Sequence, residues 1–199
     1  MNTNRRAGLS VYTAKPQIIY MEKNPGKNLI PANDTGRVQA LNRYQILGST
    51  PERSFDTIVK LATQFFNLPV ALINFVDRES VFVKSHTGLD GITSSPRNAS
   101  LCSLAMLTDE VTVFETIPLA DPCLLANSVS AAELGFKFYA GAPLITFDSF
   151  RIGTICVMGY EKRKFSGKER ILLQNMATIV INEIELRLQE ISMPANSKI

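Results

Sequence analysis

The sequence FKFYAGAPLITFDSFRIGTICVMG spans residues 136–159 and carries the strongest structural signal in the chain. Two apolar runs, Phe138–Phe147 and Ile152–Met158, flank a short polar turn at Asp148 and Ser149. This arrangement predicts a β-hairpin, and both arms are too apolar to face water. We therefore expect the hairpin to lie inside an antiparallel sheet.

The first arm of this hairpin is interrupted by Gly141 and Pro143. Proline has no N–H to donate to a sheet, and glycine leaves room for a close neighbour. The two residues predict a bulge in this arm or a cavity beside it. Tyr139 lies in the same arm, where a phenol can line an apolar cavity and still hydrogen-bond a ligand. A core tyrosine with its hydroxyl at the surface fits the sequence equally well.

Helical periodicity predicts two helices before the first strand. The first covers residues 37–47, and Gly48 ends it. The second begins at Thr50, a residue type favoured at the N-cap, and ends at Asn67 or before Pro69. The second helix has one broad apolar face, so it should pack against the sheet.

A long final helix is predicted over residues 167–191, because Ser166 and Glu169 have the spacing of a capping box. It carries two apolar stripes, one of which can cover the sheet. The second stripe repeats at spacings of four and three, as a coiled-coil seam does. This stripe predicts a homodimer, the alternative being contact with the 37–47 helix of the same chain. It consists of Ala177, Ile181, Ile184, Leu188 and Ile191.

The remaining elements are short. They are strands at Val70–Val76, Val81–Ser85 and Val111–Phe114, and one or two helical turns within Leu101–Leu107. Residues 88–100 and 115–135 lack a regular period, and connections of this length are commonly binding loops. Strands grouped as hairpins between terminal helices predict an α+β fold, with the helices on one face of a central antiparallel sheet.

Composition divides the chain into an N-terminal arm at 1–36, one domain at 37–191 and a short tail at 192–199. The arm holds five basic and two acidic side chains, which accounts for the whole net charge of +3. A nucleic-acid-binding domain needs a clustered basic face, and the neutral remainder has no such surplus. No run of apolar residues approaches the roughly 18 of a membrane span. We therefore expect neither a nucleic-acid partner nor a membrane span.

Three cysteines, Cys102, Cys123 and Cys156, have no Cys-x-x-Cys spacing. An odd number of cysteines fits a reducing compartment, so a cytoplasmic location is expected. His86 is the only histidine, and no cluster of histidines and cysteines predicts zinc or haem ligation. The sequence therefore indicates no metal site and names no cofactor.

Two segments of the predicted hairpin, Tyr139–Leu144 (YAGAPL) and Gly153–Val157 (GTICV), resemble the central hairpin of GAF domains. Further short matches follow the same order between Arg43 and Gln189. They are RYQIL at 43–47, PERSFD at 51–56, Val76-Asp77, FVK at 82–84, Gly88-Leu89, SLC at 100–102, Asp121-Pro122 and Asn127. The chain most resembles the sensor-type GAF domains found beside histidine kinases and diguanylate cyclases.

This resemblance implies a PAS-like fold with a loop-covered pocket on the face of the sheet opposite the terminal helices. It also implies a non-enzymatic sensor of an unidentified small molecule, acting through a homodimer or a signalling-enzyme partner. Its candidate ligand-binding residues are Cys102, Asp121, Phe138, Tyr139, Gly141, Pro143 and Cys156. Leu104 stands where relatives often have a histidine, and Cys123-Leu124 replaces an Arg-Phe pair. The pocket is therefore expected to be more apolar than in those relatives.

Two other functions stay open at this point. Some GAF proteins reduce free methionine sulfoxide with cysteines at the pocket, and Cys102 or Cys123 could supply that thiol chemistry. The third alternative is a dimerisation scaffold with a filled core and no ligand.

Overall fold

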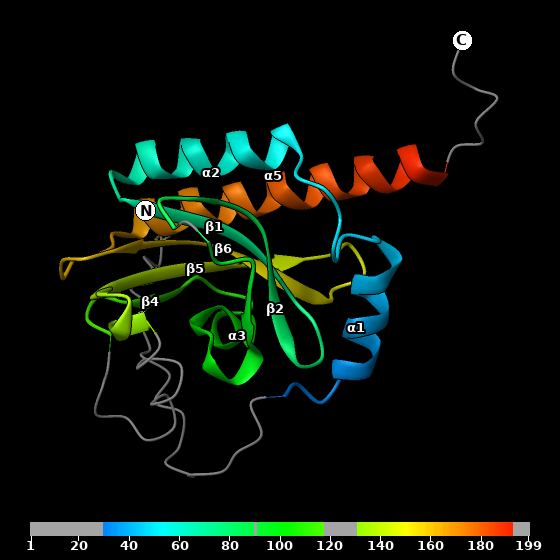
Figure 1. The fold of residues 1–199 in the computed structure, drawn as a ribbon, viewed down its shortest axis with the longest axis horizontal. Coiled ribbons are helices and arrows are strands. Elements are labelled where there is room, and N and C mark those ends of the chain that lie inside the picture. Colours follow the sequence, from blue (N-terminus) through cyan, green and yellow to red (C-terminus); the bar gives the residue numbers. More distant parts are fainter. Residues whose placement is uncertain (1–29, 90, 118–130, 193–199) are drawn as a thin grey trace, which may run out of the picture.

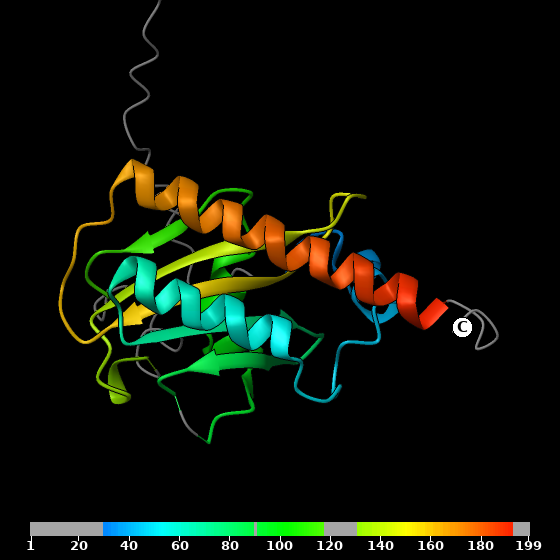
Figure 2. The same cartoon turned by 90° about the horizontal axis from the view of Figure 1, so that it is seen from above.

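The computed structural model describes residues 30–89, 91–117 and 131–192. A central sheet has α2 (Arg53–Phe66) and α5 (Gly167–Ser192) along one face and α3 (Leu101–Ala105) on the opposite face (Figure 1). α1 (Asp34–Arg43) lies at one end of the sheet, and α2 and α5 lie side by side (Figure 2). The predicted α+β fold is confirmed.

Among the described residues, six antiparallel strands form the sheet, in the order β3-β2-β1-β6-β5-β4. Their bounds are Val70–Val76 (β1), Ser80–Thr87 (β2), Ser94–Pro96 (β3), Thr112–Phe114 (β4), Phe138–Ile145 (β5) and Arg151–Gly159 (β6). β3, together with the 3-10 turn η1 (Arg97–Ala99), falls where the sequence predicts a loop. β5 and β6 form the predicted hairpin, and β6 also pairs with β1, so the hairpin lies inside the sheet as expected.

β5 tolerates Pro143 because β4 does not extend far enough to pair with this residue. Within the described part of the chain, β4 pairs only with residues 139–141, so Pro143 has a neighbouring strand on the β6 side alone. A proline is tolerated where no second strand needs its N–H. The register of β5 against β6 shifts between Leu144 and Ile145 because Ile152 is an extra residue in β6, so the irregularity lies in the second arm and not in the arm for which the sequence predicts a bulge.

α1 ends earlier than the sequence predicts. Gln45 has a φ of +48°, in the left-handed region, so the helix cannot continue to Leu47. The chain turns there, and Tyr44 and Ile46 point into the core. Helical periodicity alone could not detect this reversal, because Tyr44 and Ile46 are buried by a turn rather than by a helix face.

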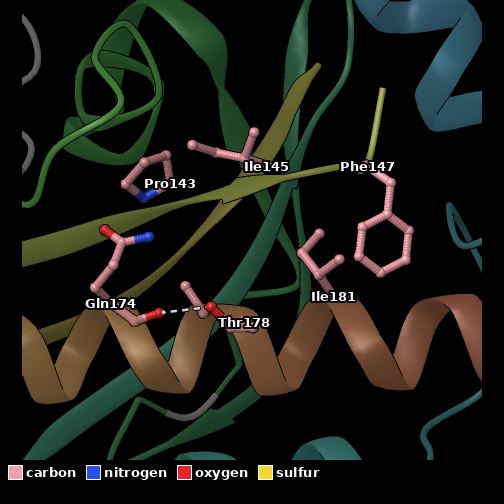
Figure 3. A pocket seen from close by; sticks show the side chains of 7 residues that line it. Pro143, Ile145, Phe147, Gln174, Thr178 and Ile181 are labelled. Atoms are coloured by element: carbon pink, nitrogen blue, oxygen red, sulfur yellow. Dashed lines mark hydrogen bonds between the residues drawn. The ribbon is translucent and has the colours of Figure 1, made fainter. Parts of the chain in front are cut away.

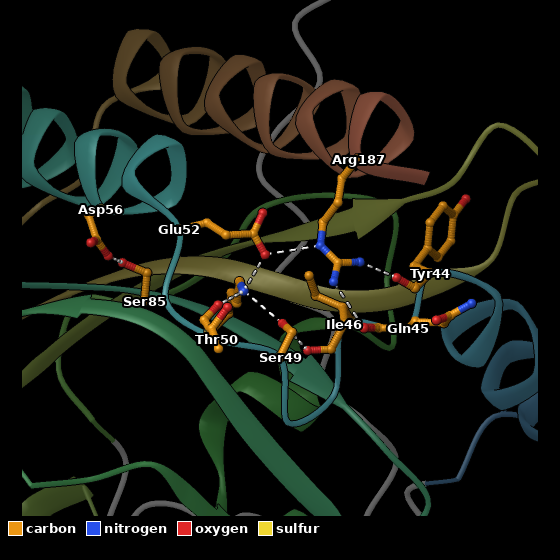
Figure 4. Close-up of polar contacts among 10 residues, drawn as sticks. Tyr44, Gln45, Ile46, Ser49, Thr50, Glu52, Asp56, Ser85 and Arg187 are labelled. Atoms are coloured by element: carbon orange, nitrogen blue, oxygen red, sulfur yellow. Dashed lines mark hydrogen bonds and ion pairs between the residues drawn. The ribbon is translucent and has the colours of Figure 1, made fainter. Parts of the chain in front are cut away.

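A buried lysine, Lys84, fixes the segment between α1 and α2, whose residues Ser49, Thr50 and Glu52 are labelled in Figure 4. Lys84 Nζ donates to Ser49 Oγ, to the Thr50 carbonyl and to Glu52 Oε1, each at 2.7 Å. The same Glu52 oxygen accepts a hydrogen bond from Arg187 Nε of α5 at 3.0 Å. Thr50 is therefore held in a loop, and Glu52 rather than the predicted Thr50 is the N-cap residue of α2.

α5 begins at the predicted capping box. The Ser166 N–H donates to Glu169 Oε2 at 2.7 Å, and the Glu169 N–H donates to Ser166 Oγ at 3.3 Å. Each side chain satisfies a backbone N–H of the first turn that has no partner within the helix. In the part of the chain described here, neither α5 nor any other helix has the length and apolarity needed to cross a bilayer.

The apolar stripe of α5 assigned above to a dimer packs within the chain itself. Ala177, Ile181 and Ile184 are buried in the core between α5 and the sheet, Leu188 is half-buried beside them, and Ile191 is exposed. A helix that lies across a sheet buries a broad arc of its surface, and α5 uses most of this stripe for that contact. These residues therefore do not supply a free dimer surface, which corrects the prediction.

Candidate functional site

A cluster of five polar or sulfur-containing side chains is buried between the sheet and α3. Its members are Asn74, Cys102, Tyr139, Thr154 and Cys156. Asn74 on β1 is directly opposite Thr154 on β6, and Cys156 lies two residues further along the same face of β6. α3 packs on β1, β5 and β6 and contributes Cys102. We call this group the polar cluster.

β1 is regular at Asn74, and the irregularity beside it lies in the neighbouring strand β2. The β1–β2 register shifts between Ile73 and Asn74 because Lys84 is an extra residue in β2, opposite these two positions. On the other side of β1, Gly153 lies so close to the Asn74 carbonyl that a Cβ at this position would collide with it. The glycine therefore allows β6 to approach β1 closely at Asn74.

The two thiols of the polar cluster are adjacent and free. Cys102 Sγ lies 3.6 Å from Cys156 Sγ, and Asn74 Nδ2 donates to Cys102 Sγ at 3.1 Å. The hydrogen bond between the thiols lowers the pKa of Cys102 and raises the pKa of Cys156 well above its usual range. Burial opposes the first shift and adds to the second. Cys102 is thus the thiol of the pair that ionises more readily.

Two hydroxyl groups of the polar cluster lack hydrogen-bond partners. Tyr139 Oη and Thr154 Oγ1 are buried, and neither forms a hydrogen bond of normal geometry with any residue that the structure describes, although both lie near enough to the Cys102 thiol to lower its pKa. The Tyr139 hydroxyl lies against Gly141, where a Cβ would overlap it. Burial, together with the nearby thiols, raises the pKa of Tyr139 well above its usual range, so this phenol stays protonated and can donate. Buried hydroxyls are nearly always paired, so two unpaired ones side by side mark the polar cluster as a candidate site.

The surroundings of the polar cluster are apolar. Side chains from β1, from α3 and the residue after it, from the segment before β5 and from β6 pack around it, namely Leu72, Val76, Leu101, Met106, Phe136 and Met158. A molecule held here would meet an apolar wall with a few hydrogen-bonding groups, which is the usual character of a small-molecule site.

The predicted site residues divide into four sets, of which the last is Pro143 alone. Cys102, Tyr139, Gly141 and Cys156 come together on the α3 face, as a common site requires. Phe138 does not join them, because alternation along β5 turns it to the helical face, where its ring centroid lies 5.7 Å from that of Phe165. Asp121 lies outside the described residues, as does Cys123.

Pro143 lines a separate groove between the tip of the β5–β6 hairpin and α5 (Figure 3). The other lining residues are Ile145, Phe147, Gln174, Ala177, Thr178 and Ile181. Its volume is about 90 Å³, well below the roughly 300 Å³ at which ligand pockets begin. Phe147 at its rim is 76% exposed. This groove is therefore too small to be the sensor pocket.

Asn74 and Thr154 are site residues that sequence reasoning missed. Each is a polar residue inside an apolar strand, in the runs VALINFV and GTICV. A polar side chain at a position where both faces of the strand are buried is the signal that could have identified them.

A buried arginine joins α1 to the end of β1, close to the polar cluster. Arg37 donates to Asp34 Oδ1 at 2.7 Å and to the Val76 carbonyl, two residues after Asn74. Arg97 holds the same carboxylate with two hydrogen bonds of 2.8 and 2.9 Å. Burial opposes ionisation of Asp34, but the hydrogen bonds from Arg97 and Arg37 outweigh it and lower the pKa. In the described segments, no group of three or more acidic, histidine or cysteine side chains is arranged to hold a metal ion.

Comparison with known proteins identifies one curated relative and several solved structures of the same fold. A cyclic di-GMP phosphodiesterase from Pseudomonas aeruginosa is 30% identical over 156 residues, which is 77% of this chain and 26% of that protein. The chain thus spans about a quarter of the length of this relative.

Two solved structures share the fold at low sequence identity. The free methionine-R-sulfoxide reductase from Neisseria meningitidis has a TM-score of 0.57 and 15% identity, over 81% of this chain and 96% of that structure. A GAF domain region from Geobacter sulfurreducens has a TM-score of 0.54 and 19% identity, over 76% of this chain and 97% of that structure. The model of the GAF domain matches residues 50–184, and the chain therefore belongs to the GAF domain family.

Proposed function

We propose that this chain is a non-catalytic sensor that binds a small molecule at the polar cluster and transmits its occupancy to the terminal helices. The observation that supports the proposal is the pair of buried hydroxyls, Tyr139 Oη and Thr154 Oγ1, which have no hydrogen-bond partner among the described residues. An unpaired buried polar group costs about 1–3 kcal/mol. A bound molecule that hydrogen-bonds both groups would recover that free energy, and this gain would contribute to its affinity.

The chemistry of the polar cluster indicates the class of molecule. Tyr139 remains a neutral donor, and the five residues of the cluster include no lysine or arginine to balance an anion. A buried anion without a counter-charge is costly. We therefore propose an uncharged molecule with at least one hydrogen-bond acceptor, such as a carbonyl oxygen, and an otherwise apolar body.

The sheet offers a route from the polar cluster to the helices. Thr154 and Cys156 face α3, whereas Ile155 and Val157 of the same strand belong to the core beneath α2 and α5. Asn74 is joined to α1 through the Val76–Arg37 hydrogen bond. A molecule that shifts β6 or β1 would favour one packing of these helices over another, and the changed helix packing would be read by a second copy or by a signalling enzyme.

Native mass spectrometry of freshly purified protein tests the proposal. We expect a retained small molecule in the wild type, and its loss in Thr154→Val and Tyr139→Phe, because each variant removes one hydroxyl of the polar cluster. Thr87→Val, a half-buried strand position at the far end of β2, is the matched control and should retain the molecule. If neither native mass spectrometry nor a thermal-shift library screen detects binding to the wild type, the sensor proposal fails and a scaffold role remains.

The thiol pair supports a second candidate function, reduction of a sulfoxide. Cys102 and Cys156 are close enough to form a disulfide while a substrate sulfoxide is reduced to the sulfide, and the sulfoxide oxygen leaves as water with the two thiol protons. A fold neighbour is named as a free methionine-R-sulfoxide reductase. Free methionine sulfoxide with dithiothreitol as the regenerating reductant is the assay. If the wild type reduces free methionine sulfoxide and Cys102→Ser does not, the reductase function is favoured over the sensor. A wild type without reductase activity would exclude the reductase function.

A further inference from the structure

The outer face of α5, turned away from the sheet, carries no charge over most of its length. Its exposed positions between Lys168 and Glu190 are Ile171, Asn175, Thr178, Ile179, Asn182, Leu186 and Gln189. Ile171, Ile179 and Leu186 are 64%, 54% and 56% exposed. The neighbouring helix α2 also exposes the apolar Leu61 and Phe65, but it differs in that the charged Arg53 and Lys60 are among its exposed positions. A helix face that meets only water normally carries charged side chains, so this outer face has the composition of a contact surface.

The spacing of these residues is symmetric. From Lys168 to Gln189 the exposed positions follow one another at intervals of three, four, three, one, three, four and three residues. The midpoint of this pattern falls between Thr178 and Ile179. A two-fold axis at the midpoint, perpendicular to the helix, would superimpose the outer face on that of an antiparallel copy.

We propose that the outer face of α5 binds the same face of a second copy of this chain in an antiparallel, two-fold symmetric dimer. In this arrangement Ile171 meets Leu186 of the second copy, Asn175 meets Asn182, and Thr178 meets Ile179. Apolar side chains thus pair with apolar ones, and each amide faces another amide. An interface of this kind is self-complementary, as two-fold symmetry requires.

The charges at the two ends of the face favour the antiparallel arrangement. Lys168 comes to lie beside Gln189 and Glu190 of the second copy, so opposite charges approach one another at both ends. A parallel, in-register pair would instead place Lys168 against Lys168 and Glu190 against Glu190, and like charges in contact oppose association. The antiparallel arrangement also sets the positive end of one helix dipole beside the negative end of the other.

The groove beside α5 adds to the interface. It shares Thr178 with the outer face, and the exposed Phe147 stands at its rim (Figure 3). A two-fold axis perpendicular to the helix brings both copies of Phe147 to the same side of the pair, near its centre. A parallel pair would place them on opposite sides.

The size of the face predicts the strength of the dimer. From Lys168 to Glu190 the helix is about 33 Å long and about 10 Å wide, which gives roughly 330 Å² on each copy. A standard interface buries about 800 Å² on each partner. Even with Phe147, we therefore expect a reversible dimer with a dissociation constant in the micromolar range.

Sedimentation velocity from about 1 to about 100 µM protein tests the association, since a micromolar dissociation constant lies in this window. We expect the wild type to shift from monomer to dimer. Ile179→Glu places two carboxylates at the two-fold axis and should weaken the dimer about tenfold or more, which corresponds to at least about 1.4 kcal/mol. Leu134→Glu makes the same change at an exposed leucine outside α5 and should leave the dimer intact. A wild type that stays monomeric, or a dimer unaffected by Ile179→Glu, would overturn the proposal.

Crosslinking with a short bismaleimide tests the orientation, in a Cys123→Ser background. The antiparallel arrangement separates the two copies of residue 171 by about 22 Å, so Ile171→Cys alone should not crosslink. A mixture of Ile171→Cys and Leu186→Cys should crosslink. Efficient crosslinking of Ile171→Cys to itself would show a parallel pair and refute the arrangement.

The inference deepens the dimer component of the proposed function but does not need the ligand. A protein that dimerises through this face and binds no small molecule would therefore keep the inference and lose the sensor proposal.

Discussion

Replacement of Tyr139 by phenylalanine removes a single hydroxyl group and leaves the ring in place. The ring is fully buried between β5 and α3, and its hydroxyl has no partner among the described residues. No cavity of side-chain size is created, because only one oxygen atom is lost. The substitution therefore isolates the free energy of one unpaired polar group.

The expected effect is an increase in stability. An unsatisfied buried hydroxyl costs about 1–3 kcal/mol, so Tyr139→Phe should raise the free energy of unfolding of the ligand-free protein by about 1 kcal/mol or more. For a domain of this size, 1 kcal/mol corresponds to a rise in Tm of about 2–4 °C. The same variant should bind the proposed ligand up to about tenfold more weakly, since it loses one neutral hydrogen bond. Gain of stability with loss of binding is the expected signature of a functional site.

Urea denaturation followed by circular dichroism measures the first effect, with the slope m as a check that the denatured state is unchanged. Thr154→Val is a companion variant that removes the other unpaired hydroxyl at nearly constant volume, and it should change stability in the same direction. A loss of 1 kcal/mol or more in ligand-free Tyr139→Phe would refute the reasoning, because it would mean that the hydroxyl already has a partner in the protein.

Three further changes give equally specific outcomes. Gly141→Ala places a Cβ against the Tyr139 hydroxyl and should lower the free energy of unfolding by about 2 kcal/mol in urea melts, with a smaller loss in the Tyr139→Phe background. Asp34→Asn leaves the buried Arg37 without its carboxylate and should cost about 3 kcal/mol at pH 7. Because the pKa of Asp34 is lowered in the folded protein, the stability that its carboxylate contributes is present above the unfolded value near 3.8 and is lost as the pH falls through the folded pKa. The variant and the wild type should therefore have similar stability in acid melts. The control Asp109→Asn, at an exposed ion pair, should change the stability little at either pH. Ser166→Ala removes the capping acceptor of α5 and should lower Tm by an amount equivalent to about 1 kcal/mol.

The parts of the fold that the sequence predicted are those encoded by neighbouring residues. The capping box at Ser166 and Glu169, the apolar period of α2 and the β5–β6 hairpin each depend on residues within one element or one turn. The predicted end of α1 was wrong because one residue, Gln45, adopts a left-handed conformation. No period reports such a reversal, and its cause lies in the loop contacts made by Lys84 and Arg187, which are distant in sequence.

The candidate site was predicted only in part, because it is assembled from distant segments. Asn74 and Cys102 are 28 residues apart, and Asn74 and Cys156 are 82 apart, yet one amide lies within hydrogen-bonding reach of both sulfurs. The sequence could nominate the cysteines and Tyr139 but could not show that they converge. The wrong assignment of an apolar stripe of α5 to a dimer interface has a similar origin. Periodicity identified apolar stripes but could not say which arc the sheet covers, and the four-three stripe lies on the covered side.

The two proposed surfaces lie on opposite sides of the same strands, and this arrangement has a thermodynamic consequence. The polar cluster faces α3, whereas Ile179 lies on the outer face of α5 and cannot touch a molecule held there. If occupancy changes the packing of α5, ligand and second copy are linked, and each must change the affinity for the other by the same factor. Ile179→Glu should then alter ligand affinity at high protein concentration, where the wild type is dimeric, and leave it unchanged at low concentration, where both proteins are monomers. Isothermal titration at the two concentrations measures this difference. If the wild type and Ile179→Glu bind the ligand with equal affinity at both protein concentrations, ligand binding and dimerisation are independent. The sheet would then not transmit the signal.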